Sequence, residues 1–169
     1  HAYYKAETIA MGMTVQSEVI NPKNGGQMNM QMGKKSYSSD ELKSKINDHR
    51  LDKDLYYKEN GETIELVAIE NALGEECYVV KRDDGKGKSS TEFYSTNSGL
   101  LIQNISQQVS EKDKDPATST VQFSAYKDVD GFKYPSKLTM DINGNPMEIN
   151  VSKMDLNCKL KKSEFSWED

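Results

Sequence analysis

The chain has 169 residues, of which 35% are hydrophobic and 29% are charged. A chain of this size and composition is long enough for one compact domain with its own core, so it needs neither disulfides nor metals to fold. Lys and Arg number 22 against 27 Asp and Glu, a net charge of -5, which argues against nucleic acid as a partner. No apolar run is long enough for a transmembrane segment.

The first elements are two strands rich in methionine. Met11, Met13, Val15 and Val19 share one parity, and Met28, Met30 and Met32 continue it after the turn residues 21–26. Alternation with a period of two predicts strands with one apolar face. If the hairpin closes around Asn24, Val19 pairs near Met28 and Val15 near Met32, so the methionine side chains share one face.

One helix is predicted over residues 38–50. Ser38 and Glu41 have the spacing of a capping box, and Leu42, Ile46 and His49 follow as a narrow stripe on one helix face. We expect this helix to lie across the sheet. The methionine face then has two interpretations, a loosely filled core under the helix or a soft wall for an apolar ligand, since methionine is flexible and polarizable.

The rest of the chain reads as successive hairpins. Asn60-Gly61, Asp84-Gly85, Asn97-Ser98-Gly99, Asp130-Gly131 and Asn143-Gly144 are turn signals between alternating apolar runs. Within each predicted strand, the apolar residues that share one parity are Ile64, Leu66 and Ala68; Cys77 and Val79; Leu101, Ile105 and Val109; Val121, Phe123 and Ala125; Leu138, Met140 and Ile142; Met147, Ile149 and Val151. The charged run 110–118 predicts a disordered loop. These patterns predict a mainly antiparallel sheet with one buried face.

Catalytic and metal motifs are weak. There are two histidines and two cysteines, Cys77 and Cys158, so we expect no catalytic triad, no metal site and no cofactor. The two cysteines are interpreted as buried free thiols, with one long-range disulfide as the alternative. Gly87-Lys88-Ser89 lacks the glycine of a phosphate-binding loop and is interpreted as a turn.

Three segments in the C-terminal two-thirds resemble the bacterial outer-membrane lipoprotein-sorting (LolA-like) proteins. Residues 64–80 (IELVAIENALGEECYVV) are similar to a strand, turn and strand of that family. Residues 93–101 (FYSTNSGLL) and 126–138 (YKDVDGFKYPSKL) resemble two later motifs of the family, in the same order and close to relatives from Bacteroidetes envelopes. The match covers about residues 62–165.

The resemblance implies a mainly β (α+β) fold, a curved antiparallel half-barrel sheet with one or a few helices on its concave side. It also implies a single LolA-like domain over residues 1–169. Because the chain opens at the Met-rich hairpin, it is left open whether the N-terminal helix and first strands of the family are missing. The family is located in the periplasm or cell envelope and shelters acyl chains, and it has no catalytic residues to transfer.

We therefore expect a non-enzymatic binding module of the cell envelope that holds lipid or lipoprotein acyl chains in an apolar cavity. The candidate lining residues are Met11, Met13, Met28, Met30, Met32, Leu42 and Ile46. The alternative is an interaction or sensing domain of the same fold that contacts an envelope protein. A third reading, an enzyme that works with a carboxylate pair, would require a polar cleft with two facing acids.

Overall fold

The computed structural model describes residues 3–108, 117–142 and 144–168. It divides the chain into two compact units, His1–Tyr56 with Cys158–Asp169, and Tyr57–Asn157. Strands dominate both units and pair antiparallel, and the described residues contain one α-helix. The predicted mainly β fold is thereby confirmed. The strands are divided between two sheets, and the single domain expected over residues 1–169 stays a prediction.

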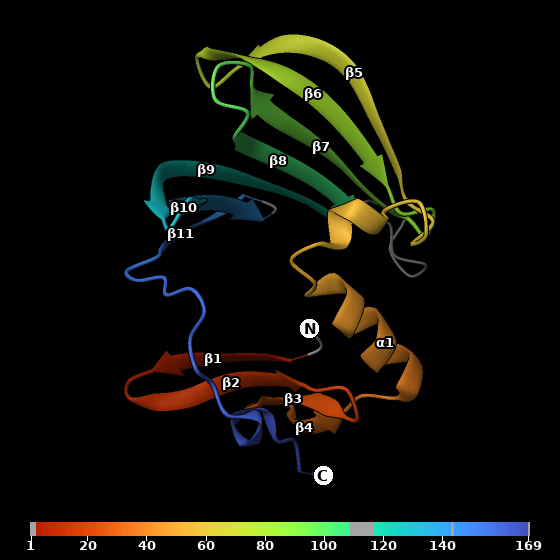
Figure 1. The fold of residues 1–169 in the computed structure, drawn as a ribbon, viewed down its shortest axis with the longest axis vertical. Coiled ribbons are helices and arrows are strands. Elements are labelled where there is room, and N and C mark those ends of the chain that lie inside the picture. Colours follow the sequence, from red (N-terminus) through yellow and green to blue (C-terminus); the bar gives the residue numbers. More distant parts are fainter. Residues whose placement is uncertain (1–2, 109–116, 143, 169) are drawn as a thin grey trace. The chain divides into compact units, whose positions relative to one another are not determined.

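The sheet of the first unit has four strands in chain order: β1 (Tyr4–Ala10), β2 (Met13–Ile20), β3 (Gly25–Asn29) and β4 (Gly33–Ser36) (Figure 1). Strand β1 was not predicted. It joins β2 through Met11 and Gly12, whose φ angles are 52° and 76°, as a two-residue hairpin turn requires. Met11 is therefore a turn residue and not the first residue of a strand.

The predicted register of the next hairpin is wrong by two residues. Val19 pairs with Gly26 and Ser17 pairs with Met28, because the turn closes at Asn21, whose amide donates to the carbonyl of Asn24 at 3.0 Å. Gly25 and Gly26 belong to β3 and not to the turn.

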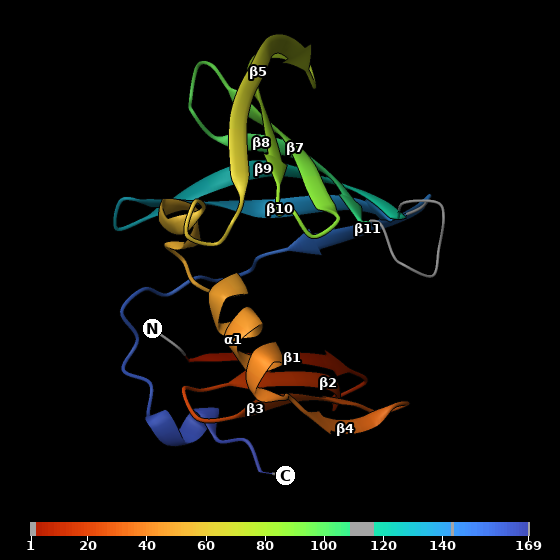
Figure 2. The same cartoon turned by 90° about the vertical axis from the view of Figure 1, so that its right-hand side faces the viewer.

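Helix α1 (Ser39–Asp48) packs on one face of this sheet (Figure 2). The predicted capping box is present: the Ser38 hydroxyl accepts from the Glu41 amide, and the Glu41 carboxylate accepts from the Ser38 amide. Leu42 is the buried residue of α1. A Cβ on Gly25 would lie 3.2 Å from the Leu42 Cδ1, so the helix contacts the sheet where β3 has no side chain.

Polar groups fix the same face of the sheet to α1. The carboxylate of Glu18 on β2 accepts from the Tyr37 hydroxyl, and its oxygens lie 3.0 Å from the Lys45 Nζ and 3.7 Å from the His49 Nε2. The Tyr4 ring stacks on His49 with centroids 3.7 Å apart. Burial raises the pKa of Glu18, but the bonds from Tyr37 and Lys45 outweigh it and lower that pKa. Burial, with the bond to Glu18, raises the pKa of Tyr37.

Trp167 covers the opposite face, after the short helix η2 (Lys162–Phe165). Successive side chains of a strand point to opposite faces, so Gly26 and its partner Ser36 lie on the face away from α1. The Trp167 indole donates to the Ser36 hydroxyl at 2.8 Å, and the Lys34 Nζ lies 4.7 Å from its ring centroid. Asn24 donates to the Trp167 carbonyl at 3.1 Å.

The second unit is a seven-stranded meander with its strands in chain order (Figure 1). The strands are β5 (Thr63–Ala72), β6 (Glu75–Asp83), β7 (Lys88–Ser95), β8 (Leu101–Gln108), β9 (Ala117–Val129), β10 (Phe132–Ile142) and β11 (Asn145–Asn150). The strand direction turns strongly across the sheet, so that β5 stands upright in Figure 2 while β10 and β11 lie across. The sheet is thus curved, as predicted, with β5 and β11 as edges. A 3-10 turn, η1 (Lys53–Tyr56), ends the first stretch of the other unit.

Two irregularities change which side chains share a face. The register shifts between Leu66 and Ala68 in β5, and again where Phe93 and Tyr94 pair with β8. The predicted set of Ile64, Leu66 and Ala68 is therefore split, because a bulge at Val67 sends Ala68 to the opposite face. Residues 110–116 of the expected loop lie outside the described residues. The last two residues of the loop, 117 and 118, are the first residues of β9.

The two cysteines differ in exposure. Cys77 on β6 is a buried free cysteine, as expected, and burial raises the pKa of its thiol. Cys158 is exposed, so the prediction that both thiols are buried is wrong for Cys158. It follows β11 in a stretch without regular secondary structure.

Candidate functional site

The candidate site is one face of the seven-stranded sheet. Its middle row runs across all seven strands through directly paired residues, which therefore point to the same side. The pairs are continuous from β5 to β11 and join Leu66, Val80, Glu92, Asn104, Val121, Met140 and Met147. Five of these seven side chains are apolar, with the two polar ones at the centre.

An apolar row lies two residues further along the strands, on the same face. On β5 to β7 it joins Ile69, Tyr78 and Tyr94, and on β9 to β11 it joins Phe123, Leu138 and Ile149. Every member is aliphatic or aromatic. With strands about 4.8 Å apart, six spacings give this row a length of roughly 29 Å.

A polar row lies on the other side of the middle row. It joins Ile64, Arg82, Ser90, Ser106 and Ser119 through direct pairs on β5 to β9. The same face therefore becomes more polar along the strands, from the apolar row through the middle row to the polar row.

An ion-pair cluster joins the middle and polar rows. The Arg82 guanidinium lies 3.0 Å from a Glu62 oxygen and 3.5 Å from a Glu92 oxygen. Glu92 is 8% exposed, and its carboxylate also accepts from the Tyr94 hydroxyl at 2.8 Å and from the Asn104 amide at 3.5 Å. These partners satisfy the hydrogen-bonding capacity of a buried carboxylate on a largely apolar face.

The face is most open at the edges of the sheet. Leu66 on β5 is 59% exposed, and Ile69, Tyr78, Met147 and Ile149 are exposed as well. Towards the centre Ile102 is buried and Val80, Val121 and Phe123 are partly buried. Clusters of exposed large apolar side chains on one face are characteristic of binding surfaces, whereas single ones are not.

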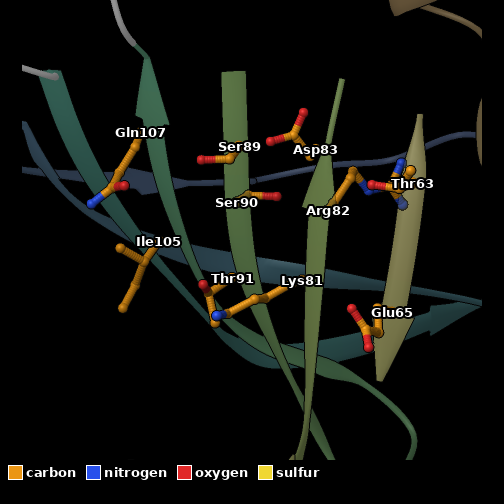
Figure 3. Close-up of a pocket in the computed structure, with 10 residues that line it drawn as sticks. All are labelled: Thr63, Glu65, Lys81, Arg82, Asp83, Ser89, Ser90, Thr91, Ile105 and Gln107. Carbon is orange, nitrogen blue, oxygen red and sulfur yellow. The ribbon is translucent and has the colours of Figure 1, made fainter. Parts of the chain in front are cut away.

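The opposite face of the same strands is mainly polar and contains a hollow of about 430 Å³ (Figure 3). Residues of β5 to β8 line it, among them Glu65, Lys81, Asp83 and Thr91, and so do Arg82 and Ser90 of the polar row. Its charged side chains are of both signs and belong to neighbouring strands. The hollow contains none of the predicted lining residues and no histidine or cysteine.

The structure does not bring the seven predicted lining residues together into one wall. Met11, in the β1–β2 turn, is 97% exposed and Met32, in the β3–β4 turn, is 86% exposed. Met13 and Met30 are exposed too. Met28 is partly buried but pairs with Ser17 and Lys34 on the face away from α1.

The two helix residues differ from the methionines. Leu42 is buried against Gly25, and Ile46 is partly buried. The expected face of methionines under the helix is therefore wrong, because Met11, Met30 and Met32 lie in turns and Met28 lies on the other side of the sheet. A ligand-lining role for the seven residues stays a prediction.

The apolar face of β5 to β11 was only partly visible in the sequence. The predicted parities of Val121 with Phe123, Leu138 with Met140, and Met147 with Ile149 are those of this face. On β6 the residues of both parities are apolar. Tyr78 and Val80 lie on the apolar face, whereas the predicted pair Cys77 and Val79 lies on the opposite face. The neighbouring strand does not select between the two parities, because Phe93 lies across from Val79 as Tyr94 lies across from Tyr78.

Other kinds of site have little support in the part of the chain that the structure describes. It contains no group of three His, Cys, Asp or Glu side chains that could hold a metal ion. No described helix combines the length and the hydrophobicity that crossing a bilayer requires. His49 packs against the ring of Tyr4 and lies 3.7 Å from the Glu18 carboxylate.

Comparison with known proteins gives one informative result. No family model matches the sequence, and no curated protein matches it. A crystal structure from Vibrio parahaemolyticus, described as a "putative outer membrane lipoprotein-sorting protein domain", is similar with a TM-score of 0.57 over 96% of this chain and 80% of that one, at 11% identity. At this identity the likeness shows the fold, and the fold is the one that the LolA-like resemblance predicted.

Proposed function

We propose that this protein is a non-enzymatic module of the bacterial cell envelope that holds an acyl chain, from a lipid or a lipoprotein, against the apolar face of β5 to β11. The observation that carries the proposal is the open apolar row, with Ile69 and Ile149 exposed at its ends. The fold of the lipoprotein-sorting domain supports the same class of ligand and the same location.

Burial of the chain alone would supply the affinity. Each CH₂ group removed from water contributes about 0.8 kcal/mol, so about ten such groups contribute about 8 kcal/mol before the entropic cost of association. The apolar row, roughly 29 Å long, offers enough length for a chain of this size. No hydrogen bond to the chain is needed.

The test compares two leucines of β5 and its turn. Leu66 lies on the apolar face and is 59% exposed, whereas Leu73 lies in the β5–β6 turn and is 56% exposed. We expect Leu66→Ser to weaken the binding of a fluorescent dodecanoyl probe about tenfold, since a leucine contact is worth about 1.5 kcal/mol or more. Leu73→Ser, with the same chemical change, should leave the binding constant unchanged.

The same assay tests the methionines. Met32→Ser should not alter probe binding if the acyl chain lies on β5 to β11, and should weaken it if the predicted methionine wall is the site. Lipid extraction and mass spectrometry of the purified protein complete the experiment. Absence of both co-purifying lipid and probe binding would refute the proposal and favour the protein-interaction alternative.

A further inference from the structure

The first unit contains a hollow of about 520 Å³ that is separate from the apolar face of β5 to β11. It is lined by Tyr3, by the β2–β3 turn (residues 21–24) and by residues of the stretch 162–167, which includes η2. All of these residues belong to the unit His1–Tyr56 with Cys158–Asp169. Small-molecule sites usually have volumes of about 300–1,000 Å³, so the hollow is large enough for a small ligand.

Hydrogen bonds join the two walls of the hollow. The side-chain amide of Asn21 donates to the Phe165 carbonyl at 2.9 Å, and that of Asn24 donates to the Trp167 carbonyl at 3.1 Å. Asn21 is itself held in place, because its side-chain oxygen accepts from the backbone amides of Lys23 and Asn24. These bonds order the walls before a ligand enters, which lowers the entropic cost of binding.

The charged side chains that line the hollow are both positive. They are Lys23 and Lys162, and none of the described lining residues carries a carboxylate. Neither ammonium group forms an ion pair with a described carboxylate. An anion in the hollow would therefore be attracted by two cations that have no competing acidic partner.

The acids of the neighbouring stretch do not cancel this charge. The Glu164 carboxylate accepts from the Lys161 backbone amide at 2.8 Å, and Glu168 follows Trp167 outside the lining. Two further lysines lie in the same region, Lys161 itself and Lys34, whose ammonium group lies over the Trp167 ring. The described side chains around the hollow thus comprise four lysines and two glutamates, a net charge of two positive.

Aromatic rings supply an apolar surface in the same hollow. The ring centroids of Tyr3 and Phe165 lie 5.4 Å apart, with the planes tilted by 58°. Tilted rings about 4.5–7 Å apart attract each other. Tyr3 is 36% exposed, so part of this aromatic pair is accessible to a further ring. A ligand in the hollow would meet aromatic surface and positive charge together.

We infer that this hollow binds a small organic anion with an aromatic ring. The ring contacts Tyr3 and Phe165, and the anionic group lies near the ammonium groups of Lys23 and Lys162. A cation would be repelled by both lysines, and an anion without a ring would leave the aromatic surface in water. The inference goes beyond the proposed acyl-chain function, because it concerns the other unit and another class of ligand.

The experiment titrates four ligands into the full chain and follows its backbone amides by NMR. 3-Phenylpropionate, 3-phenylpropanamide and 3-phenylpropylamine share the ring, whereas acetate has the carboxylate alone. We expect 3-phenylpropionate to shift the amide resonances of Lys23, Asn24, Ser163 and Ser166. It should bind about fivefold more tightly than each of the other three ligands, since an exposed ion pair is worth up to about fivefold in affinity.

Variants assign this preference to the lysines. Lys23→Gln and Lys162→Gln should each reduce the ratio of carboxylate to amide affinity, and the double variant should bring the ratio below about twofold. Both lysines are exposed, so these substitutions should leave the fold intact, which circular dichroism verifies. Lys43→Gln is the matched control, because Lys43 lies on α1 of the same unit and outside the lining.

The results that would overturn the inference are distinct from those that would refute acyl-chain binding. Unshifted amides of the lining residues, equal affinity for the carboxylate and the amide, or a preference that survives in the double variant would each overturn it. Leu66→Ser, which should weaken binding of the dodecanoyl probe, should leave the affinity for 3-phenylpropionate unchanged. Loss of 3-phenylpropionate binding in Leu66→Ser would overturn the assignment of this ligand to the first unit.

Discussion

Gly26 is the position where one added methyl group should have the largest effect on the first unit. A Cβ at this residue would lie 2.3 Å from the Cζ2 and 2.4 Å from the Cε2 of Trp167, and 2.5 Å from the carbonyl oxygen of Lys35. Movement of the indole ring relieves the two contacts with Trp167, and the contact with the Lys35 oxygen requires a shift of the β4 backbone as well. Gly26→Ala should therefore displace Trp167 from the sheet.

The expected cost lies between two limits. Overpacking that the structure absorbs by small shifts costs about 1–3 kcal/mol, whereas complete loss of a buried tryptophan costs about 3–5 kcal/mol. Displacement of the ring also breaks the bond from its Nε1 to Ser36 and removes the ring from Lys34. We expect a loss of about 3 kcal/mol in the free energy of unfolding of this unit.

Intrinsic fluorescence is the direct assay, because Trp167 is the one tryptophan of the chain. Gly26→Ala should shift its emission to the red in native buffer and lower the urea midpoint. The control is the same substitution in a Trp167→Ala background, followed by circular dichroism, where it should cost at least 1 kcal/mol less. Unchanged emission and midpoint, or full additivity in this cycle, would refute the assigned contact.

Three further outcomes follow from the local structure. Ser38→Ala should destabilise the first unit by about 1 kcal/mol through loss of the N-cap, measured by urea unfolding, with Ser39→Ala as the control. Glu18 has a pKa lowered below its ordinary value of 4.5. The stability that its ionised carboxylate contributes is therefore complete above pH 4.5 and is lost as the pH falls through the pKa of the folded protein. Below pH 4.5 the melting temperature should fall less steeply in Glu18→Gln than in the unchanged protein. Iodoacetamide at pH 8 should label exposed Cys158 within minutes and buried Cys77 only after denaturation, and equal rates would contradict the assigned burial.

The sequence predicted elements well where one parity or one capping pattern stood alone. The Ser38 capping box and the helix after it were found because their residue types and spacing have no competing interpretation. The apolar parities of β9 to β11 were found for the same reason. Hairpin turns at Leu73-Gly74 and Asp130-Gly131 have positive φ angles at both residues, and the glycine in each marked them in advance.

The sequence was misleading where contacts distant in the chain decide the structure. Gly25-Gly26 has the composition of a turn, but Gly26 is a strand residue that leaves space for Trp167, 141 positions later. The bulge at Val67 reverses the parity of β5 and has no signal of its own. The methionines were grouped by parity alone, and parity does not reveal that a strand ends before Met30.

The order of the units along the chain has a consequence for biosynthesis. Residues 158–169 belong to the first unit but follow the whole of Tyr57–Asn157, so a ribosome makes the later unit before it makes Trp167. Until then the four-stranded sheet lacks the side chain that covers its face away from α1, whereas all strands of the seven-stranded sheet have already been synthesised. Vectorial synthesis, which usually lets the N-terminal part mature first, here leaves that part to be finished last.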